Sequence, residues 1–223
     1  MMIFYFCNAG GIFMKDEIKL EWFGHSAYKV EYKGYSVFID PYADGMVPGL
    51  SILKEKANLV LCSHEHQDHG YREAIEITEA SIENPFEISF IECSHDDEGG
   101  TKRGMNKIHV LKADGINLCH LGDIGDMLTP KQIEKIEGVT VLMAPVGGFY
   151  TIDPEKLNTL VNKINPKILV PMHYRNEEFG FDVIGTLGDY LKYCKNIIEY
   201  DTNTIYINDN PKEQTAILKY MKK

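Results

Sequence analysis

The sequence of 223 residues lacks several patterns that would assign it to a familiar class of protein. Its five cysteines are an odd number and none forms a CxxC pair, so neither a disulfide framework nor a thiolate zinc knuckle is indicated. No stretch follows the GxxxxGK[ST] pattern of a nucleotide-binding P-loop. No apolar run is long enough to span a bilayer, so we expect no membrane partner. A reducing, cytoplasmic location fits these absences best.

Positive charge is also scarce. Lys and Arg total 23 against 33 Asp and Glu, which gives a formal net charge of -10 at pH 7. An acidic surface repels phosphate backbones, so we expect no nucleic-acid partner. With 44% hydrophobic residues and no linker-like stretch, the chain is long enough to bury the core of one domain. We expect that domain over residues 14–223, with residues 1–13 as an N-terminal extension of unknown role, and a homo-oligomer is possible.

The sequence pattern predicts mainly strands in the first half of the chain and alternating helices and strands in the second half. Apolar patterns predict strands at 18–24, 28–40, 58–63, 86–94, 107–123, 139–146, 167–173, 196–200 and 204–208. Lys33-Gly34 and Asp114-Gly115 predict hairpin turns, and the continuous run 58–63 predicts a strand buried on both faces. Helices are expected near 71–77, 129–138, 153–164 and 184–194 and, weakly, at the end of the chain. This order is typical of packed sheets covered by helices.

One short stretch, CSHEHQDHG (62–70), concentrates polar side chains directly after an apolar strand. His64 and His66 are two residues apart in extended chain, so both point to the same side. Asp68 and His69 follow where the chain must turn. Crowding imidazoles and a carboxylate in this way costs desolvation unless something binds them. The pattern predicts a metal site, and four ligands from one turn can reach two neighbouring cations.

Three more polar residues also follow apolar strands. They are His95 after FIECS, Asp123 after INLCHLG and His173 after ILVPM. Each alone is compatible with an ordinary buried or surface residue. Together with the first cluster they complete a ligand set, and we expect them to emerge at the same edge of a sheet.

The chain resembles the metallo-β-lactamase-fold hydrolases in its HxHxDH motif, which is followed by a distant His, by the Asp of HLGD and by the His of PMH. The stretch GHSAYKVEYKGYSVFIDPY is similar to the branch that includes the bacterial ascorbate-phosphate lactonase. The resemblance covers about residues 18–210 and implies an α/β fold, a four-layer αββα sandwich with metals at one edge of the sheets. It implies two divalent ions, zinc by preference, with manganese or iron also suitable. By motif, the ligands are His64, His66 and His95 for one ion, Asp68, His69 and His173 for the other, Asp123 as the bridge, and Asp40 as a structural residue.

These features predict a dinuclear metal-dependent hydrolase. A metal-bridging hydroxide, aligned by Asp68, would attack a small anionic ester, lactone or phosphodiester. The net positive charge of such a site favours anions. The alternative is a metal-binding redox or oxygen-handling protein of the same fold without hydrolytic turnover. That alternative is disfavoured because flavodiiron proteins have Glu where this chain has His66.

Four other residues are weaker candidates for contacting the substrate or supporting a ligand. His25 in FGHSAY is either a pocket residue or a turn residue. Arg103, in the glycine-containing stretch 96–106, could approach a bound anion or belong to a flexible charged loop. Tyr150, between a strand and a helix, lines a pocket or packs a turn. His120 lies three residues before Asp123 and could support it.

Overall fold

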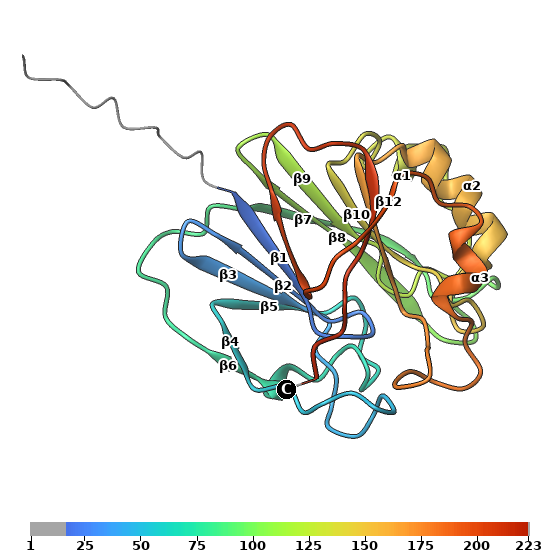
Figure 1. The fold of residues 1–223 in the computed structure, drawn as a ribbon, viewed down its shortest axis with the longest axis horizontal. Coiled ribbons are helices and arrows are strands. Elements are labelled where there is room, and N and C mark those ends of the chain that lie inside the picture. Colours follow the sequence, from blue (N-terminus) through green and yellow to red (C-terminus); the bar gives the residue numbers. More distant parts are fainter. Residues whose placement is uncertain (1–16, 223) are drawn as a thin grey trace, which may run out of the picture.

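The computed structural model describes residues 17–222, so the expected extension over residues 1–13 lies outside the described part. Two sheets face each other across the core (Figure 1). The first has the strand order β13 (Thr204–Ile207), β1 (Ile18–Trp22), β2 (Tyr28–Tyr32), β3 (Tyr35–Ile39) and β5 (Leu59–Leu61). The second has the order β12 (Ile197–Glu199), β14 (Gln214–Ile217), β11 (Ile168–Met172), β10 (Val141–Pro145), β9 (Ile116–His120), β8 (Met105–Ala113) and β7 (Glu87–Ser94).

The core lies between these sheets and between the second sheet and its helices. Alternate residues of β1 and β2 are buried, as expected of strands with one face towards the core. Every residue of β10 and β11 is buried, because these parallel strands are covered on both sides. Helix α2 (Pro154–Ile164) places Leu157, Leu160 and Ile164 in the core. Asp153 caps its first turn, and Asn165 ends it in the left-handed conformation.

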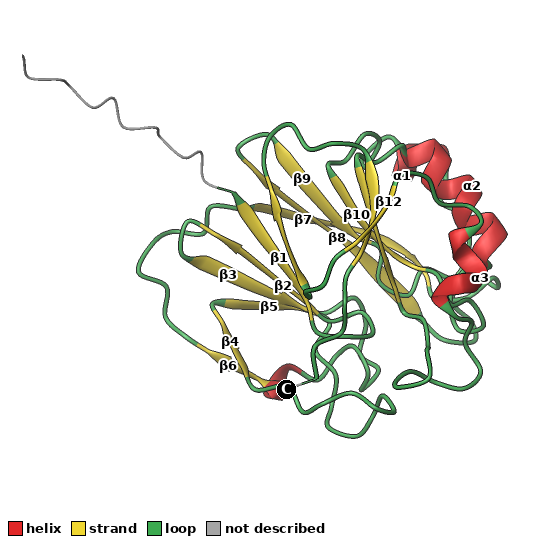
Figure 2. Cartoon of the chain, in the orientation of Figure 1, coloured by secondary structure: helices red, strands yellow, loops and turns green. Residues whose placement is uncertain are grey.

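The outer layers differ between the two sheets. Helices α1 (Pro130–Ile133), α2 and α3 (Leu187–Leu191) lie on the side of the seven-stranded sheet (Figure 2). On the side of the five-stranded sheet, the short pair β4 (Glu55–Ala57) and β6 (Ile75–Ile77) packs with Phe38 in a second apolar cluster. The expected sandwich is therefore present, with the thinner outer layer on the five-stranded sheet. No helix within residues 17–222 is long and apolar enough to cross a membrane.

Several local predictions were wrong. Strand β5 is only half-buried, because it is the last strand of its sheet and pairs with β3 alone. Residues 71–77 form a single 3-10 turn, η1 (Arg72–Ala74), followed by β6 rather than a helix. The expected C-terminal helix is strand β14, which pairs with β11 and β12. Helix α3 begins later than expected because Thr186 caps it.

Candidate metal centre

The loop after β5 turns tightly and gathers its polar side chains on one side. The backbone carbonyl of His66 accepts hydrogen bonds from the amides of His69, at 2.9 Å, and Gly70, at 2.6 Å. Gly70 lies so close to the backbone of His64 and Glu65 that a Cβ would clash there. The turn therefore depends on glycine at this position.

The three distant strand-end residues do meet this loop. The Oδ2 atom of Asp123 lies 3.2 Å from Nε2 of His173, 3.3 Å from Nε2 of His69 and 3.6 Å from Nε2 of His95. His95, Asp123 and His173 follow β7, β9 and β11 of the seven-stranded sheet, whereas His69 follows β5 of the other sheet. His95, Asp123 and His173 therefore emerge at one edge of the seven-stranded sheet, as expected, because β7, β9 and β11 run in the same direction. The loop after β5 of the other sheet meets them there.

Two groups of side chains in this centre could each hold a cation. We name His64, His66 and His95 the outer set, because His66 is exposed. We name Asp68, His69 and His173 the inner set, in which His69 and His173 are completely buried. Within each set the ligand-capable atoms lie within 4.8 Å of one another, and His25 joins the inner set on the same criterion.

The chemistry of these groups fits a metal. Buried atoms without a hydrogen-bond partner include Nε2 of His64, Nε2 of His69, both ring nitrogens of His173 and Oδ1 of Asp123. Leaving buried polar atoms unpaired is costly, and these atoms converge on one small volume. Imidazole and carboxylate are suitable ligands for zinc, manganese or iron. The residues present therefore fit divalent cations.

The protonation states are also favourable for binding a cation. Burial, with the nearby His69, lowers the pKa of His64 to about 3. Burial, with the nearby His173, lowers the pKa of His25 to about 4. Both rings are neutral at pH 7, which is the form that binds metal. Burial opposes a charge on His69, but the carboxylates of Asp123 and Asp68 outweigh it and raise the pKa of His69, and a cation would replace that proton.

A buried network behind the ligands fixes their orientation. Asp40, at the end of β3, lies 2.8 Å from Nδ1 of His69 and accepts hydrogen bonds from the amide and hydroxyl of Ser63, both at 2.6 Å. The Ser63 hydroxyl is in turn 2.9 Å from Nδ1 of His64. His120 lies farther back, with Nε2 2.9 Å from the carbonyl of Ser26. Asp40 thus supports a residue of each set, and the Nε2 atoms of His64 and His69 are left to bind a cation.

His25 is a buried component of the centre rather than an ordinary turn residue. Its backbone is left-handed, with φ of 49°, and its carbonyl accepts hydrogen bonds from the Trp22 indole at 3.0 Å and the His173 amide at 3.2 Å. Its ring lies 4.0 Å from that of His173, and its Nε2 atom lies 3.4 Å from Oδ2 of Asp68. A strained backbone in a buried polar cluster is typical of a functional site.

A cavity of about 440 Å³ opens on the centre. Among its lining residues are His66, Asp68 and Asp123 from the metal centre, and Arg103, Tyr150, Met46 and Phe181 from elsewhere. The Arg103 guanidinium lies 4.5 Å from the centre of the Tyr150 ring. A larger cavity, of about 780 Å³, lies beside Arg175 and Glu199 and is lined by no member of either set. We therefore associate function with the smaller cavity.

The loop that carries Arg103 is organised by its own aspartate. Asp96 accepts four backbone hydrogen bonds at 2.8–2.9 Å, from the amides of Glu98, Gly100, Lys102 and Arg103. Burial opposes the charge, but these bonds outweigh it and lower the pKa of Asp96 to about 2. The loop is thus an ordered one that wraps a carboxylate, and its amides are already occupied.

Sequence reasoning missed four residues of this region. Asp96 carried a usable signal, because an acidic side chain just before a glycine pair can accept the amides of the following turn. Asn106 holds the loop before Asp123, since its side chain accepts the Asp123 amide at 2.9 Å and donates to the Leu121 carbonyl at 2.9 Å. Met46 and Phe181 reach the cavity from loops that show no pattern.

Comparison with known proteins agrees with this geometry. The family model described as a β-lactamase superfamily domain matches residues 19–173. A metal-dependent hydrolase of the UPF0173 group from Caldivirga maquilingensis is 27% identical over 185 residues, covering 70% of this chain and 81% of the relative. A similar relative from Ignicoccus hospitalis is 28% identical over 193 residues, covering 70% of this chain and 82% of its own.

Solved structures give the same result. A proposed Zn-dependent hydrolase of the metallo-β-lactamase superfamily from Thermotoga maritima has a TM-score of 0.71 and 29% identity, covering 90% of this chain and 97% of its own. A metallo hydrolase from Ignicoccus hospitalis has a TM-score of 0.59 and 23% identity, covering 79% of this chain and 89% of its own, and supports the fold alone. The resemblance inferred from the HxHxDH motif and its distal ligands is confirmed at the level of the superfamily.

Proposed function

Because the chain belongs to the metallo-β-lactamase superfamily, we propose that it is a metal-dependent hydrolase with two divalent cations, preferably zinc, in its buried centre. The single observation that supports this most is the convergence of three imidazole nitrogens on one carboxylate oxygen of Asp123. In this proposal the outer set and the inner set would each hold one cation. Asp123 would be a ligand as well, because its Oδ2 atom lies within 3.6 Å of imidazole nitrogens of both sets.

Cations bound there act as Lewis acids and bring the pKa of water towards neutrality. The oxygen of water forms a bond to the acyl carbon or phosphorus of the substrate. The bond to the leaving oxygen breaks, and that oxygen takes a proton from the water. An ester or phosphodiester thereby releases an alcohol, whereas a lactone opens to a hydroxy acid. Asp68 accepts a hydrogen bond from the attacking water and orients it. His25, 3.4 Å from Oδ2 of Asp68, holds this carboxylate in place.

A small anionic substrate is supported by the cavity. Arg103 lines it together with the metal-ligating residues, and its stacking on Tyr150 leaves the guanidinium charge available to an ester, lactone or phosphodiester. The ordered loop around Asp96 fixes the Arg103 backbone before the substrate arrives. Preorganised charge of this kind costs no rearrangement when the substrate binds.

The first test is metal content. Protein reconstituted with zinc and freed of excess metal should contain two ions per chain by elemental analysis, and His66→Ala should contain one, because His66 belongs to the outer set alone. Glu65→Ala is the matched control, since Glu65 is an exposed neighbour and belongs to neither set. One ion or none in the unsubstituted protein would contradict the dinuclear centre.

The second test is turnover. The zinc and manganese forms should hydrolyse at least one member of a panel of anionic esters, lactones and phosphodiesters, and chelation should abolish the activity. A coloured iron protein that reduces oxygen and hydrolyses no member of the panel would instead support the redox alternative. Visible absorption separates the two cases, because zinc is colourless.

A further inference from the structure

The loop between β10 and α2 exposes a large aromatic ring under backbone strain. Phe149 is 66% exposed and has φ of 61°. This left-handed conformation is unfavourable for a bulky side chain, and glycine or asparagine would adopt it at lower cost. Because most of its surface stays in contact with water, the side chain also gains little free energy from burial in the folded chain. The side chain at this position therefore has no evident role in stability.

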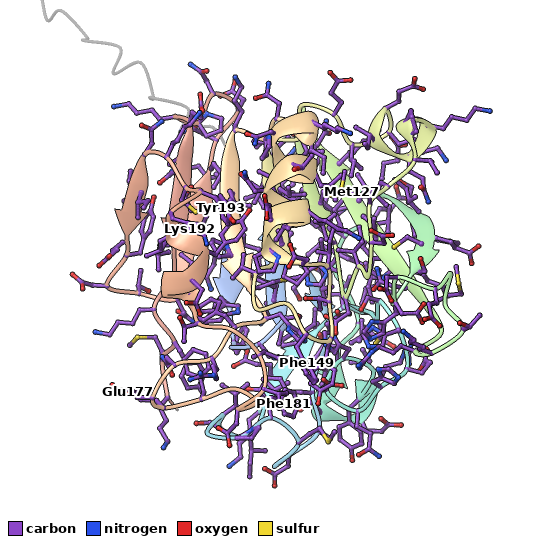
Figure 3. The ribbon with its side chains drawn as sticks, turned by 90° about the vertical axis from the view of Figure 1, so that its right-hand side faces the viewer. Met127, Phe149, Glu177, Phe181, Lys192 and Tyr193 are labelled. Atoms are coloured by element: carbon purple, nitrogen blue, oxygen red, sulfur yellow. The ribbon has the colours of Figure 1, made fainter. Side chains whose placement is uncertain are left out.

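Phe149 is the outer end of a row of rings that leads into the metal centre. Its ring lies 4.8 Å from that of Tyr150, and Tyr150 lies 6.0 Å from Phe181. Phe181 lies 5.6 Å from the buried ring of His25. Figure 3 labels Phe149 and Phe181, and both appear below the helices in that view. We name Phe149, Tyr150 and Phe181 the aromatic row.

Two rings of the aromatic row share the cavity of the metal centre with the charged groups. Tyr150 and Phe181 line it beside His66, Asp68 and Arg103, and Met46 adds a further apolar side chain. Arg103 and Tyr150 also line an adjoining cavity of about 310 Å³, to which Phe149 contributes. A molecule held at the metals and at Arg103 would therefore have apolar surface within reach along the row.

We propose that the aromatic row binds an apolar substituent, aryl or alkyl, of the substrate, so that the substrates are amphiphilic anions. This inference rests on the proposed hydrolase function and specifies the substrate of the same site. The hydrolysable anionic group lies at the metal centre and Arg103. The apolar group lies against the rings of Phe181, Tyr150 and Phe149, where aromatic contacts and exclusion of water favour it.

Two probes without a hydrolysable bond test this. Titration calorimetry with the zinc-loaded protein should show that phenylphosphonate binds about tenfold more tightly than methylphosphonate. A difference of this size is expected from roughly one aromatic contact and the apolar area that it buries. In Phe149→Asn and Phe181→Leu this ratio should fall towards one, while the affinity for methylphosphonate stays unchanged. Arg103→Ala should weaken both phosphonates equally. Phe90→Ala is the matched control, because Phe90 is 56% exposed on β7 and outside the row.

Folding is tested on the same samples. Phe149→Asn should keep or raise the unfolding temperature, because asparagine tolerates the left-handed backbone. A clear loss of stability would show that the ring serves the fold and would overturn the proposal. Equal affinities of the two phosphonates would overturn it too and would leave the anion site intact. Failure of both phosphonates to bind would overturn the anionic substrate of the proposed function along with the inference.

Discussion

The outer and inner sets contain similar side chains in different surroundings. His66 of the outer set is exposed and lines the cavity, whereas His69 and His173 of the inner set are completely buried. His69 is fixed by Asp40, and His173 is linked through its amide to His25. His64 and His95 of the outer set are buried as well, and Asp68 of the inner set lines the cavity, so the difference between the two sets lies mainly in the exposed His66. We expect the inner set to tolerate change less.

The largest effect is expected at Asp68, which belongs to the inner set and also lines the cavity. Asp68→Asn keeps the size of the side chain but removes its charge and the acceptor that orients water. Turnover at saturating metal should fall by about two to four orders of magnitude, the usual scale for losing positioned acid-base help. Metal in the outer set should remain, because His64, His66 and His95 are unchanged. Near-normal kcat in fully metallated protein would contradict the proposed role.

The next largest effect concerns stability and compares His69 with His66. His69→Ala leaves the buried Asp40 carboxylate without its imidazole partner, although Ser63 still donates to it. Breaking a buried pair in this way typically lowers the free energy of unfolding by about 3–5 kcal/mol. Because Asp40 keeps its other hydrogen bonds, we expect a loss near the lower end of this range. His66→Ala should change the free energy of unfolding by less than about 0.5 kcal/mol. Denaturant unfolding of the chelated proteins measures both, and equal losses would remove the distinction between the sets.

A smaller effect is expected from His25, which supports only the inner set. His25→Phe keeps a ring of similar size but removes the nitrogen that lies 3.4 Å from Asp68. Loss of such a supporting partner typically lowers metal affinity or activity by about 10- to 100-fold. Competition with a chelator should show that one of the two ions is held more weakly and the other is unaffected. An equal loss of affinity for both ions would show instead that His25 supports the whole centre.

The smallest effect lies outside both sets, in the loop that presents Arg103. Asp96→Ala removes the acceptor of four backbone amides. The loop should become less ordered, and KM for anionic substrates should rise. This rise should be smaller than that caused by Arg103→Ala, which removes the charge-assisted contact itself and should raise KM roughly tenfold or more. Metal content should not change. Asp97→Ala, at an exposed neighbour, is the control, and a KM change as large as that of Asp96→Ala would contradict the role of the loop.

The sequence predicted the centre better than its surroundings, for a physical reason. Only a few residue types commonly bind metals, and the proposed ligands follow strands here, so residues such as His64, His95 and Asp123 can be recognised in the sequence. Both hairpins were also predicted correctly, because Lys33-Gly34 and Asp114-Gly115 have the local chemistry that their turns require. These features depend on neighbours in sequence.

Features that depend on distant partners were not predictable. The apolar run of β5 suggested full burial, but its place at the edge of the sheet is a property of the whole fold. The last strand, β14, has weak intrinsic preference and forms because β11 and β12 lie on either side of it. Phe181 approaches His25 only after two distant loops have packed together. The composition of the cavity wall therefore could not be inferred from pattern.

The origin of the ligands in both sheets has a consequence for the lifetime of the protein. His69 follows β5 of the five-stranded sheet, and His95, Asp123 and His173 follow strands of the seven-stranded sheet. In the proposed centre each set would join the two sheets, because the inner set pairs His69 with His173 and the outer set pairs His64 and His66 with His95. A cation bound by either set would therefore cross-link the two halves of the sandwich and would bind only when both are folded. At a free concentration one hundred times its dissociation constant, it stabilises the native state by about 2.7 kcal/mol. If the proposed function holds, the supply of free metal would govern how often the chain unfolds and becomes open to proteases, as well as whether it is active.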